Sequence, residues 1–240
     1  MITIRIKRRE SAAAQIYEEV FYYNGDETVT VADFLTNINK EISLREGETG
    51  KTTTPIDWEC GCLEGKCGAC AMVINGVPRL ACRAFLKGAA KKGHICLEPL
   101  SKFPLIRDLK VDRQIIFETL RKHKLWTENA VVSDDTETRH LIYQAGQCLE
   151  CGCCLEVCPN YKGPSLQAGR KNAFPGPLFA AETYRADRTG GDTFHRSELK
   201  VLYKDLFYNT CDNSLACRDV CPAGLPLDEM QARLNSKKRT

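Results

Sequence analysis

The spacing of the cysteines constrains this chain more than any other feature. The 240 residues include 14 cysteines, which fall in two zones, 60–96 and 148–221, with none between the zones. A cysteine content of roughly 6% lies below that of a disulfide scaffold but far above that of a typical reduced enzyme. The N-terminus MITIRIKRRE lacks the apolar segment of a secretory signal, so the clustered cysteines indicate metal or redox cofactors rather than disulfides.

The first zone contains the spacing of a plant-type [2Fe–2S] site. Residues 62–70 read CLEGKCGAC, a C-x4-C-x2-C pattern, and a further cysteine follows the hairpin signal Asn75-Gly76. Two irons bridged by two sulfides need four thiolates, and a tight loop can supply three of them. The predicted ligands are Cys62, Cys67, Cys70 and Cys82.

The loop of the first motif is rich in glycine. We expect Gly61, Gly65 and Gly68 to adopt positive φ and to bring backbone N–H groups close to the sulfurs. A zinc site is the alternative, although structural zinc usually has two cysteine knuckles rather than a lone fourth cysteine. Cys60 and Cys96 fit no ligand position, and we expect them to be packing residues or idle thiols.

The second zone contains two motifs that match in register and that both end in Cys-Pro. The earlier one, residues 148–159, has the C-x2-C-x2-C-x3-C-P spacing of bacterial ferredoxins, in which the fourth cysteine ligates the other cluster. The later one, residues 211–222, has Ser214 in place of the second cysteine. Pro159 and Pro222 should turn the chain away from the clusters, and Cys153 should be a packing residue.

Interleaving the two motifs assigns two further clusters. The set predicted for a [4Fe–4S] cluster is Cys148, Cys151, Cys154 and Cys221. The remaining set is Cys158, Cys211 and Cys217. Because the hydroxyl of Ser214 is a poor iron ligand at neutral pH, this set should hold a [3Fe–4S] cluster.

The hydrophobic pattern divides the chain into a strand-rich part, 1–108, and a helical part, 109–240. The predicted strands are 2–6, 19–23 and 28–31, followed by a helix at 31–42. Helices are also predicted at 112–120, 137–145, 179–185 and 227–234.

Composition and motifs exclude several functions. The net charge of +3, from 34 basic and 31 acidic residues, is too even for a protein whose main partner is nucleic acid. The sequence has no run of 18 apolar residues that would predict a membrane span. It also lacks the G-x-S-x-G, G-x-G-x-x-G and G-x4-G-K-[ST] motifs of hydrolase and nucleotide sites. Three clusters without a catalytic site predict an electron relay whose two-electron partner is a flavin.

The sequence resembles the iron–sulfur subunits of the succinate dehydrogenase/fumarate reductase family over nearly its whole length. The resemblance rests on residues 62–82, on LEPLSKFPLIRDLKVD at 97–112 and on both Cys-Pro motifs. Gly176-Pro177 with the nearby Tyr184-Arg185 and Asp187 also fits. It implies an α+β fold, with an N-terminal β-grasp ferredoxin domain and an all-α domain like bacterial ferredoxin.

The resemblance also implies partners and a location. Electrons would pass between FAD in a dicarboxylate-binding subunit and quinone at a membrane anchor that usually binds haem b, in anaerobic respiration or the tricarboxylic acid cycle. The subunit would be peripheral to the cytoplasmic face of a bacterial inner membrane.

The chain departs from the family at two positions that are associated with quinone. Gly163 stands where many members have a tryptophan that helps to bind ubiquinone, and Asp212 stands where many have histidine. We therefore assign no quinone contact to this chain. The stretch NSLACRDVCP at 213–222 is more similar to the fumarate reductases of anaerobes, which use menaquinol.

Other functions remain open at this point. The chain could belong to another flavin-dependent quinone oxidoreductase, although such subunits commonly have a cysteine at the position of Ser214. It could also be a free multi-cluster ferredoxin, which would not purify with a flavoprotein, or a colourless zinc-binding module.

Overall fold

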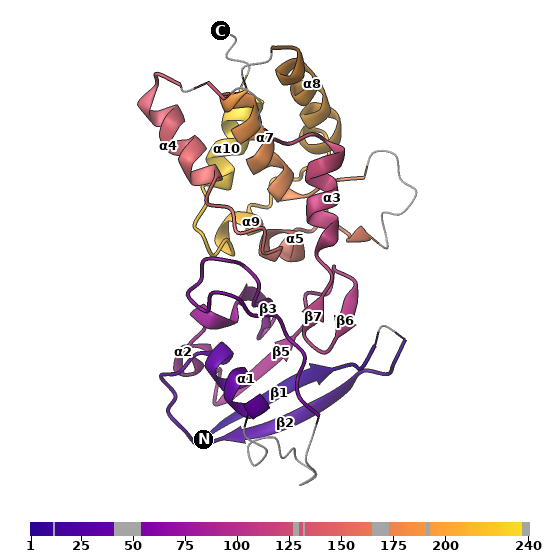
Figure 1. The fold of residues 1–240 in the computed structure, drawn as a ribbon, viewed down its shortest axis with the longest axis vertical. Coiled ribbons are helices and arrows are strands. Elements are labelled where there is room, and N and C mark those ends of the chain that lie inside the picture. Colours follow the sequence, from indigo (N-terminus) through magenta and orange to yellow (C-terminus); the bar gives the residue numbers. More distant parts are fainter. Residues whose placement is uncertain are drawn as a thin grey trace. The chain divides into compact units, whose positions relative to one another are not determined.

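The chain folds into two compact units, Met1–Asp112 and Arg113–Thr240, which are described separately below (Figure 1). The structure is a computed structural model. It describes residues 1–11, 13–40, 54–126, 130–131, 133–164, 173–190 and 193–236, so the last two residues of the predicted helix 31–42 lie outside the described residues.

The first unit is built on a five-stranded sheet with the strand order β2-β1-β5-β3-β4. Strand β1 (Ile2–Arg8) pairs antiparallel with β2 (Tyr17–Tyr23) and parallel with β5 (His94–Glu98). Strand β3 (Ala71–Ile74) pairs antiparallel with both β4 (Val77–Leu80) and β5. The predicted strands 2–6 and 19–23 are confirmed. The unit also contains the 3-10 turn η2 (Ala81–Arg83), α2 (Leu86–Ala89), and the strand pair β6 (Leu105–Arg107) and β7 (Lys110–Val111).

Helix α1 (Val31–Lys40) packs on this sheet through Phe34, whose ring makes an edge contact with Phe21 of β2. The predicted strand 28–31 is wrong, since this segment forms a turn with one isolated bridge and leads into the helix. Thr30 and Asp33 exchange side-chain and backbone hydrogen bonds, which cap the helix. These local bonds outweigh the strand preference of the β-branched residues.

A buried ion pair ties the first unit together. Arg8 at the end of β1 and Asp108 in the turn between β6 and β7 are 1% exposed, and the guanidinium bonds both carboxylate oxygens at 3.2 and 2.9 Å. Asp108 also accepts from the backbone N–H groups of Arg9 and Asp57. Because Arg8 with Arg9, Asp57 and Asp108 lie in three separate segments, this pair fixes the join between the sheet and the end of the unit.

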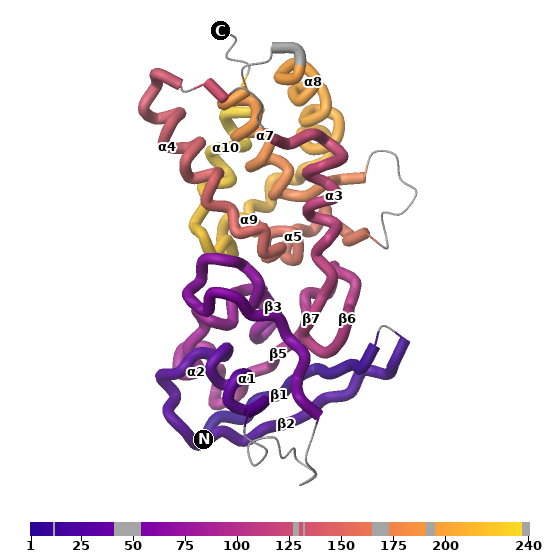
Figure 2. Tube along the Cα trace, viewed as in Figure 1, coloured from indigo at the N-terminus to yellow at the C-terminus, as the bar shows by residue number. Residues whose placement is uncertain are grey.

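The second unit is helical, and α7 (Pro177–Thr189) is its central element. This helix contacts α3 (Gln114–Lys122), α4 (Thr136–Ala145), α5 (Cys153–Val157), α8 (Thr193–Tyr203) and α10 (Leu227–Asn235). The tube in Figure 2 follows α7 between α4 and α10 on one side and α3 and α8 on the other. The part of this unit that the structure describes also contains the π-helical turn η3 (Lys204–Tyr208) and α9 (Ala216–Asp219).

The predicted helices of this unit are confirmed, but the segment 179–185 belongs to a longer helix than expected. Gly176, with φ 90° and ψ 171°, precedes Pro177, which occupies the first turn of α7. Polar residues such as Glu182 and Asp187 are buried in α7, so the buried face of this helix does not appear as an apolar stripe in the sequence. Its buried face joins a core formed by Leu141, Ala145, Ala181, Tyr184, Cys217, Leu225, Leu227 and Met230.

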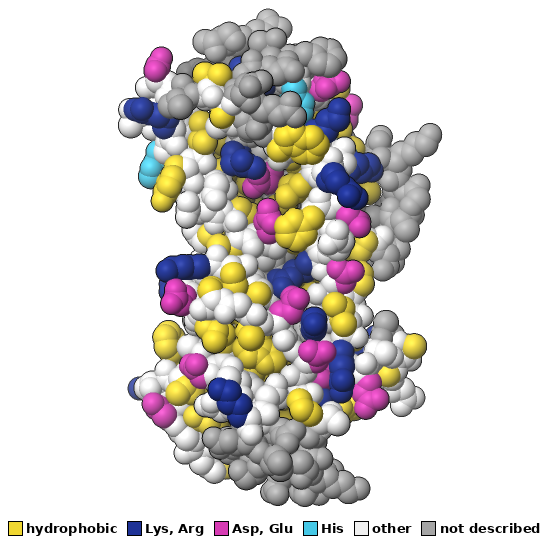
Figure 3. Space-filling model, in the orientation of Figure 1, with side chains coloured by type: hydrophobic (Ala, Val, Ile, Leu, Met, Phe, Trp, Pro, Cys, Tyr) yellow, Lys and Arg dark blue, Asp and Glu magenta, His cyan; other side chains and the backbone are white. Residues whose placement is uncertain are grey.

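On the face drawn in Figure 3, basic and acidic side chains intermingle over both units. Among the helices that the structure describes, none is both long and apolar enough to cross a membrane.

Candidate metal centres

The hairpin β3–β4 brings two of the predicted [2Fe–2S] ligands side by side. Asn75 and Gly76 both adopt positive φ, 51° and 78°, which confirms the predicted hairpin. Cys70 lies just before β3 and Cys82 just after β4, so the antiparallel register places them together. Their Sγ atoms are 3.4 Å apart, and both side chains are buried.

The other two predicted ligands lie in the loop before β3. Cys62 Sγ accepts hydrogen bonds from the backbone N–H groups of Glu64 and Lys66 at 3.3 and 3.2 Å. The N–H of Cys62 donates to Cys67 Sγ at 3.4 Å. The hydrogen bonds from Glu64 and Lys66 lower the pKa of the Cys62 thiol to about 7. This loop therefore favours the thiolate, the form that binds iron.

The glycines of this loop only partly follow the prediction. Gly65 and Gly68 adopt φ 75°, as expected. The expectation for Gly61 is wrong, and Leu63 adopts positive φ instead, at 56°. A Cβ at Gly61 would lie 3.0 Å from Cys67 Sγ, so this position needs glycine for the close approach of a sulfur rather than for its backbone conformation.

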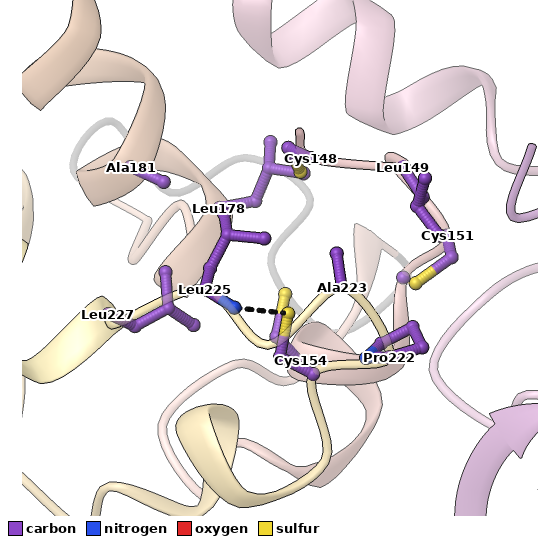
Figure 4. Close-up of a pocket in the computed structure, with 12 residues that line it drawn as sticks. Cys148, Leu149, Cys151, Cys154, Leu178, Ala181, Pro222, Ala223, Leu225 and Leu227 are labelled. Carbon is purple, nitrogen blue, oxygen red and sulfur yellow. Dashed lines mark hydrogen bonds between the residues drawn. The ribbon is translucent and has the colours of Figure 1, made fainter. Parts of the chain in front are cut away.

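In the second unit, one pocket is lined by all four cysteines of the predicted [4Fe–4S] set. Figure 4 shows Cys148, Cys151 and Cys154 around the pocket, with apolar side chains such as Leu178 and Leu225 beside them. The N–H of Leu225 donates to Cys221 Sγ at 3.4 Å. The pocket is lined by Cys148, Leu149, Cys151, Gly152, Cys154, Leu178, Ala181, Cys221, Pro222, Ala223, Leu225 and Leu227.

The thiols of this pocket differ in their electrostatic surroundings. Burial raises the pKa of Cys148 to about 12 and raises that of Cys154. The pKa of Cys151 is lowered, first by a hydrogen bond with the Cys153 thiol and further by the positive charge of Arg113. Without a bound cation the thiols of Cys148 and Cys154 hold their protons, and iron must displace those protons when it binds.

The third predicted set comes together around the other end of α5. Cys158 ends that helix, Cys217 lies in α9, which packs against α5, and Cys211 follows η3. Burial and the neighbouring Cys158 raise the pKa of Cys217 to about 11, and burial raises that of Cys211. Ser214 is exposed, in a loop where Asn213 and Leu215 adopt positive φ.

Asn160 holds this third set together. Its side-chain amide donates to the carbonyl of Thr210 at 2.7 Å and to the carboxylate of Asp212 at 2.8 Å. It thereby joins the chain just after Cys158 to the chain around Cys211.

The donor sets fit iron–sulfur clusters. The described residues that line the pocket offer only sulfur and apolar side chains, and thiolates are the usual ligands of such clusters. Among the described residues, no three His, Cys, Asp or Glu side chains form a group that could hold a single metal ion. A [4Fe–4S] or [2Fe–2S] cluster does not need such a group, because each iron takes only one or two cysteines.

Sequence reasoning missed the interactions of three side chains near the pocket, although Cys153 was expected to be a packing residue and its burial confirms this. Cys153 is fully buried and bonds the Cys151 thiol. Glu182 of α7 is 4% exposed, pairs with Arg185 at 2.7 Å and lies near enough to influence Cys148. Arg113 donates a hydrogen bond to the backbone carbonyl of Cys151, 38 residues away along the chain. Of the three, only Cys153 carried a sequence signal, its position between two ligands.

The remaining cysteines are not brought to a cluster set. Cys60 is exposed, and Cys96 is half-buried on β5. The charges of Lys7 and Glu98 act on the Cys96 thiol, and burial raises its pKa.

Comparison with known proteins identifies relatives of this chain. A family model described as "2Fe-2S iron-sulfur cluster binding domain" matches residues 3–118. The succinate dehydrogenase iron–sulfur subunit of Bacillus subtilis is 35% identical to this chain and aligns with 97% of it and 91% of the relative. The fumarate reductase iron–sulfur subunit of Wolinella succinogenes is 30% identical over 99% of this chain and 97% of the relative.

A solved structure has the same fold. A chain of the Mycobacterium smegmatis Sdh1 complex in the apo form superposes with a TM-score of 0.76 at 22% identity, covering 99% of this chain and 96% of that chain. From its similarity to two curated relatives over nearly its whole length, the chain belongs to the family of succinate dehydrogenase and fumarate reductase iron–sulfur subunits.

Proposed function

We propose that this chain is the electron-transfer subunit of a membrane-bound fumarate reductase/succinate dehydrogenase complex. It carries electrons between FAD in a dicarboxylate-binding subunit and quinone at a membrane anchor. The observation that supports this most is the single pocket lined by Cys148, Cys151, Cys154 and Cys221, the set that the interleaved motifs select for [4Fe–4S]. The electron-transfer role also follows from membership of the family.

The residues around the sites fix the thiolates, and around the pocket of the second unit they also exclude water. Iron–sulfur clusters, when bound, accept and release one electron at a time, and their potentials follow from hydrogen bonds to sulfur and from exposure. Apolar residues such as Leu178 and Leu225 keep water from the pocket. The N–H groups of Glu64 and Lys66 stabilise negative charge on Cys62 in the more exposed loop.

For the [2Fe–2S] site we propose that each iron takes one of the two cysteine pairs. Cys62 and Cys67 would hold one iron, and Cys70 and Cys82 the other. The support is the backbone hydrogen bond within the first pair and the 3.4 Å contact between the sulfurs of the second.

For the third site we propose a [3Fe–4S] cluster held by Cys158, Cys211 and Cys217. The charges of these thiols influence one another, and the serine at the position of a fourth ligand lies exposed. A serine hydroxyl holds its proton at neutral pH, so the fourth iron would lack a thiolate.

We propose that the two compact units are the two cluster-bearing domains. The strand order β2-β1-β5-β3-β4 with α1 packed against it is consistent with a β-grasp ferredoxin domain, assigned to 1–108. The helices around α7 would form the bacterial-ferredoxin-like domain, assigned to 109–240.

The partners and location are proposed from the relatives. The curated names of the relatives in B. subtilis and W. succinogenes are those of a succinate dehydrogenase and a fumarate reductase subunit. The partners would be the FAD subunit and an anchor with haem b, on the cytoplasmic face of a bacterial inner membrane. The quinone would be menaquinol, by the likeness of residues 213–222 to fumarate reductases of anaerobes.

Low-temperature EPR of the anaerobically isolated complex tests the cluster content. We expect a near-isotropic signal in the oxidised protein that disappears on reduction, together with a rhombic signal from the reduced [2Fe–2S] site. Full iron loading without the oxidised signal would contradict the [3Fe–4S] assignment.

The variant Ser214→Cys tests the position of the missing ligand. A thiolate there should add one iron per chain, convert the third site to [4Fe–4S] and remove the oxidised signal. Asn213→Cys is the matched control, because it places a thiol on the neighbouring exposed residue. If Ser214→Cys leaves iron content and spectrum unchanged, or if both variants gain iron equally, Ser214 does not occupy the position of the missing fourth ligand.

A further inference from the structure

Arg113 lies beside one cysteine of the pocket in the second unit. Its side chain is partly buried, and Nη1 donates a hydrogen bond to the backbone carbonyl of Cys151 at 3.4 Å. Arg113 immediately precedes α3, so its backbone is fixed by the start of that helix. The guanidinium remains protonated at any pH at which the protein folds.

We propose that Arg113 sets the reduction potential of the [4Fe–4S] cluster by holding a permanent positive charge next to Cys151. The inference rests on the proposed function, in which Cys151 is a cluster ligand. Arg113 is then a positioning residue, because its hydrogen bond to the Cys151 carbonyl keeps the charge in place.

The direction of the effect follows from electrostatics. Reduction adds one negative charge to the cluster and its thiolates, and a nearby positive charge stabilises that state more than the oxidised one. In a partly buried site the interaction is screened less than in water. Arg113 should therefore raise the reduction potential, and its loss should lower it.

The other charged groups around the pocket act mainly on a different cysteine. Glu182 of α7 influences Cys148, and its own charge is paired with Arg185 at 2.7 and 2.9 Å. Glu150, beside Cys151 in sequence, is half-buried, and burial raises its pKa. The charge of Glu182 thus acts on Cys148 and that of Arg113 acts on Cys151, with Glu150 next to Cys151 in the sequence.

Arg113→Gln and Arg113→Lys separate charge from hydrogen bonding. Glutamine can still donate to the carbonyl but has no charge, whereas lysine keeps the charge without the planar fork. Arg139→Gln on the exposed face of α4 is the matched control, since it removes one positive charge from the same unit away from the pocket. Each variant is purified in the complex, and its iron and sulfide contents are measured first.

The readout is a redox titration of the [4Fe–4S] cluster followed by EPR. We expect Arg113→Gln to lower the ratio of reduced to oxidised cluster at a fixed potential about tenfold, which for one electron is about 59 mV. Arg113→Lys should retain most of the native potential, and Arg139→Gln should retain all of it.

The outcomes distinguish the inference from the proposed function. If the native complex contains no [4Fe–4S] cluster, the proposed function fails first. If the cluster is present and Arg113→Gln leaves its potential unchanged, only the role of Arg113 is refuted. An equal fall in the glutamine and lysine variants would also refute it, because the charge would not be the cause. Should Arg113→Gln lose its cluster, a lysine variant with a native potential would support the role of the charge, and one with a lowered potential would refute it.

Discussion

Gly176 should be among the least replaceable residues outside the cysteines, and Gly176→Ala tests the packing that holds α5 in place. Its φ of 90° and ψ of 171° lie in a region that is essentially restricted to glycine. A Cβ added there would lie 2.1 Å from Cδ2 of Leu155, well inside van der Waals contact. Leu155 is in α5, between the predicted ligands Cys154 and Cys158.

The expected loss is the sum of two terms. Holding alanine in this conformation costs about 1–3 kcal/mol. Forcing an extra methyl group into a filled core costs about another 1–3 kcal/mol. The free energy of unfolding should therefore fall by about 2–6 kcal/mol, which for a unit of this size lowers Tm by about 10 °C or more.

Gly224→Ala is the matched control in the same unit. Gly224 also has positive φ, 66°, but a Cβ there would meet no atom within 4 Å, so only backbone strain is added. Thermal unfolding followed by circular dichroism, with iron content measured in parallel, compares the two variants. Gly176→Ala should unfold at least about 5 °C lower than Gly224→Ala and should bind less iron, because Leu155 must move. Equal melting temperatures would show that the contact with Leu155 is not the cause.

Two further outcomes are expected. Asp108→Asn should lower the free energy of unfolding of the first unit by about 2 kcal/mol, since it removes the negative charge that bonds two guanidinium nitrogens of Arg8 and leaves Arg8 paired with Glu19 alone. Glu98→Gln, which breaks the exposed pair with Lys7, should cost less than about 1 kcal/mol, and equal losses in urea unfolding would contradict this. In the iron-free protein, the Cys148 thiol has its pKa raised by burial from the ordinary 9.0 to about 12, so its stabilising contribution is complete below pH 9 and is lost as the pH rises toward 12. The free energy of unfolding, measured in urea, should be lower at about pH 10.5 than at about pH 8, and this difference should be smaller in Cys148→Ser. An equal pH dependence in both proteins would contradict the role of Cys148.

Features fixed by neighbouring residues could be predicted from the sequence. The alternation in Ile2–Arg8 specifies a strand with one buried face, and Asn75-Gly76 specifies a tight hairpin. The strand predicted at 28–31 failed for a local reason as well, because the side chain of Asp33 bonds Thr30 and starts a helix. β-propensity describes how well a residue fits a half-buried sheet. The four residues 28–31 alone do not show that a helix cap with Asp33 competes with strand formation.

Features that depend on distant packing could not be predicted. Helix α7 is central and carries buried polar residues such as Glu182, so its ends do not follow from amphipathic spacing. The four cysteines of the pocket could be grouped because an interleaving rule relates two distant motifs. No comparable rule exists for the guanidinium of Arg113, which reaches Cys151, 38 residues away along the chain, only through the tertiary fold.

The surroundings of the cysteines indicate how cluster insertion is coupled to folding in the two units. Cys62 is stabilised as a thiolate by backbone N–H groups of its own loop, so this ligand is prepared for iron once the loop has formed. Cys148 and Cys154 are neutral in the folded chain because burial disfavours their charge. Iron supplies the positive charge that stabilises the buried thiolates, and its binding releases the protons of these thiols. Burial likewise raises the pKa of Cys70 in the first unit to about 12, whereas the pKa of Cys151 in the second unit is lowered. Each site therefore combines a thiol prepared as a thiolate with buried thiols that must lose their protons, and iron loading should depend on pH in both units.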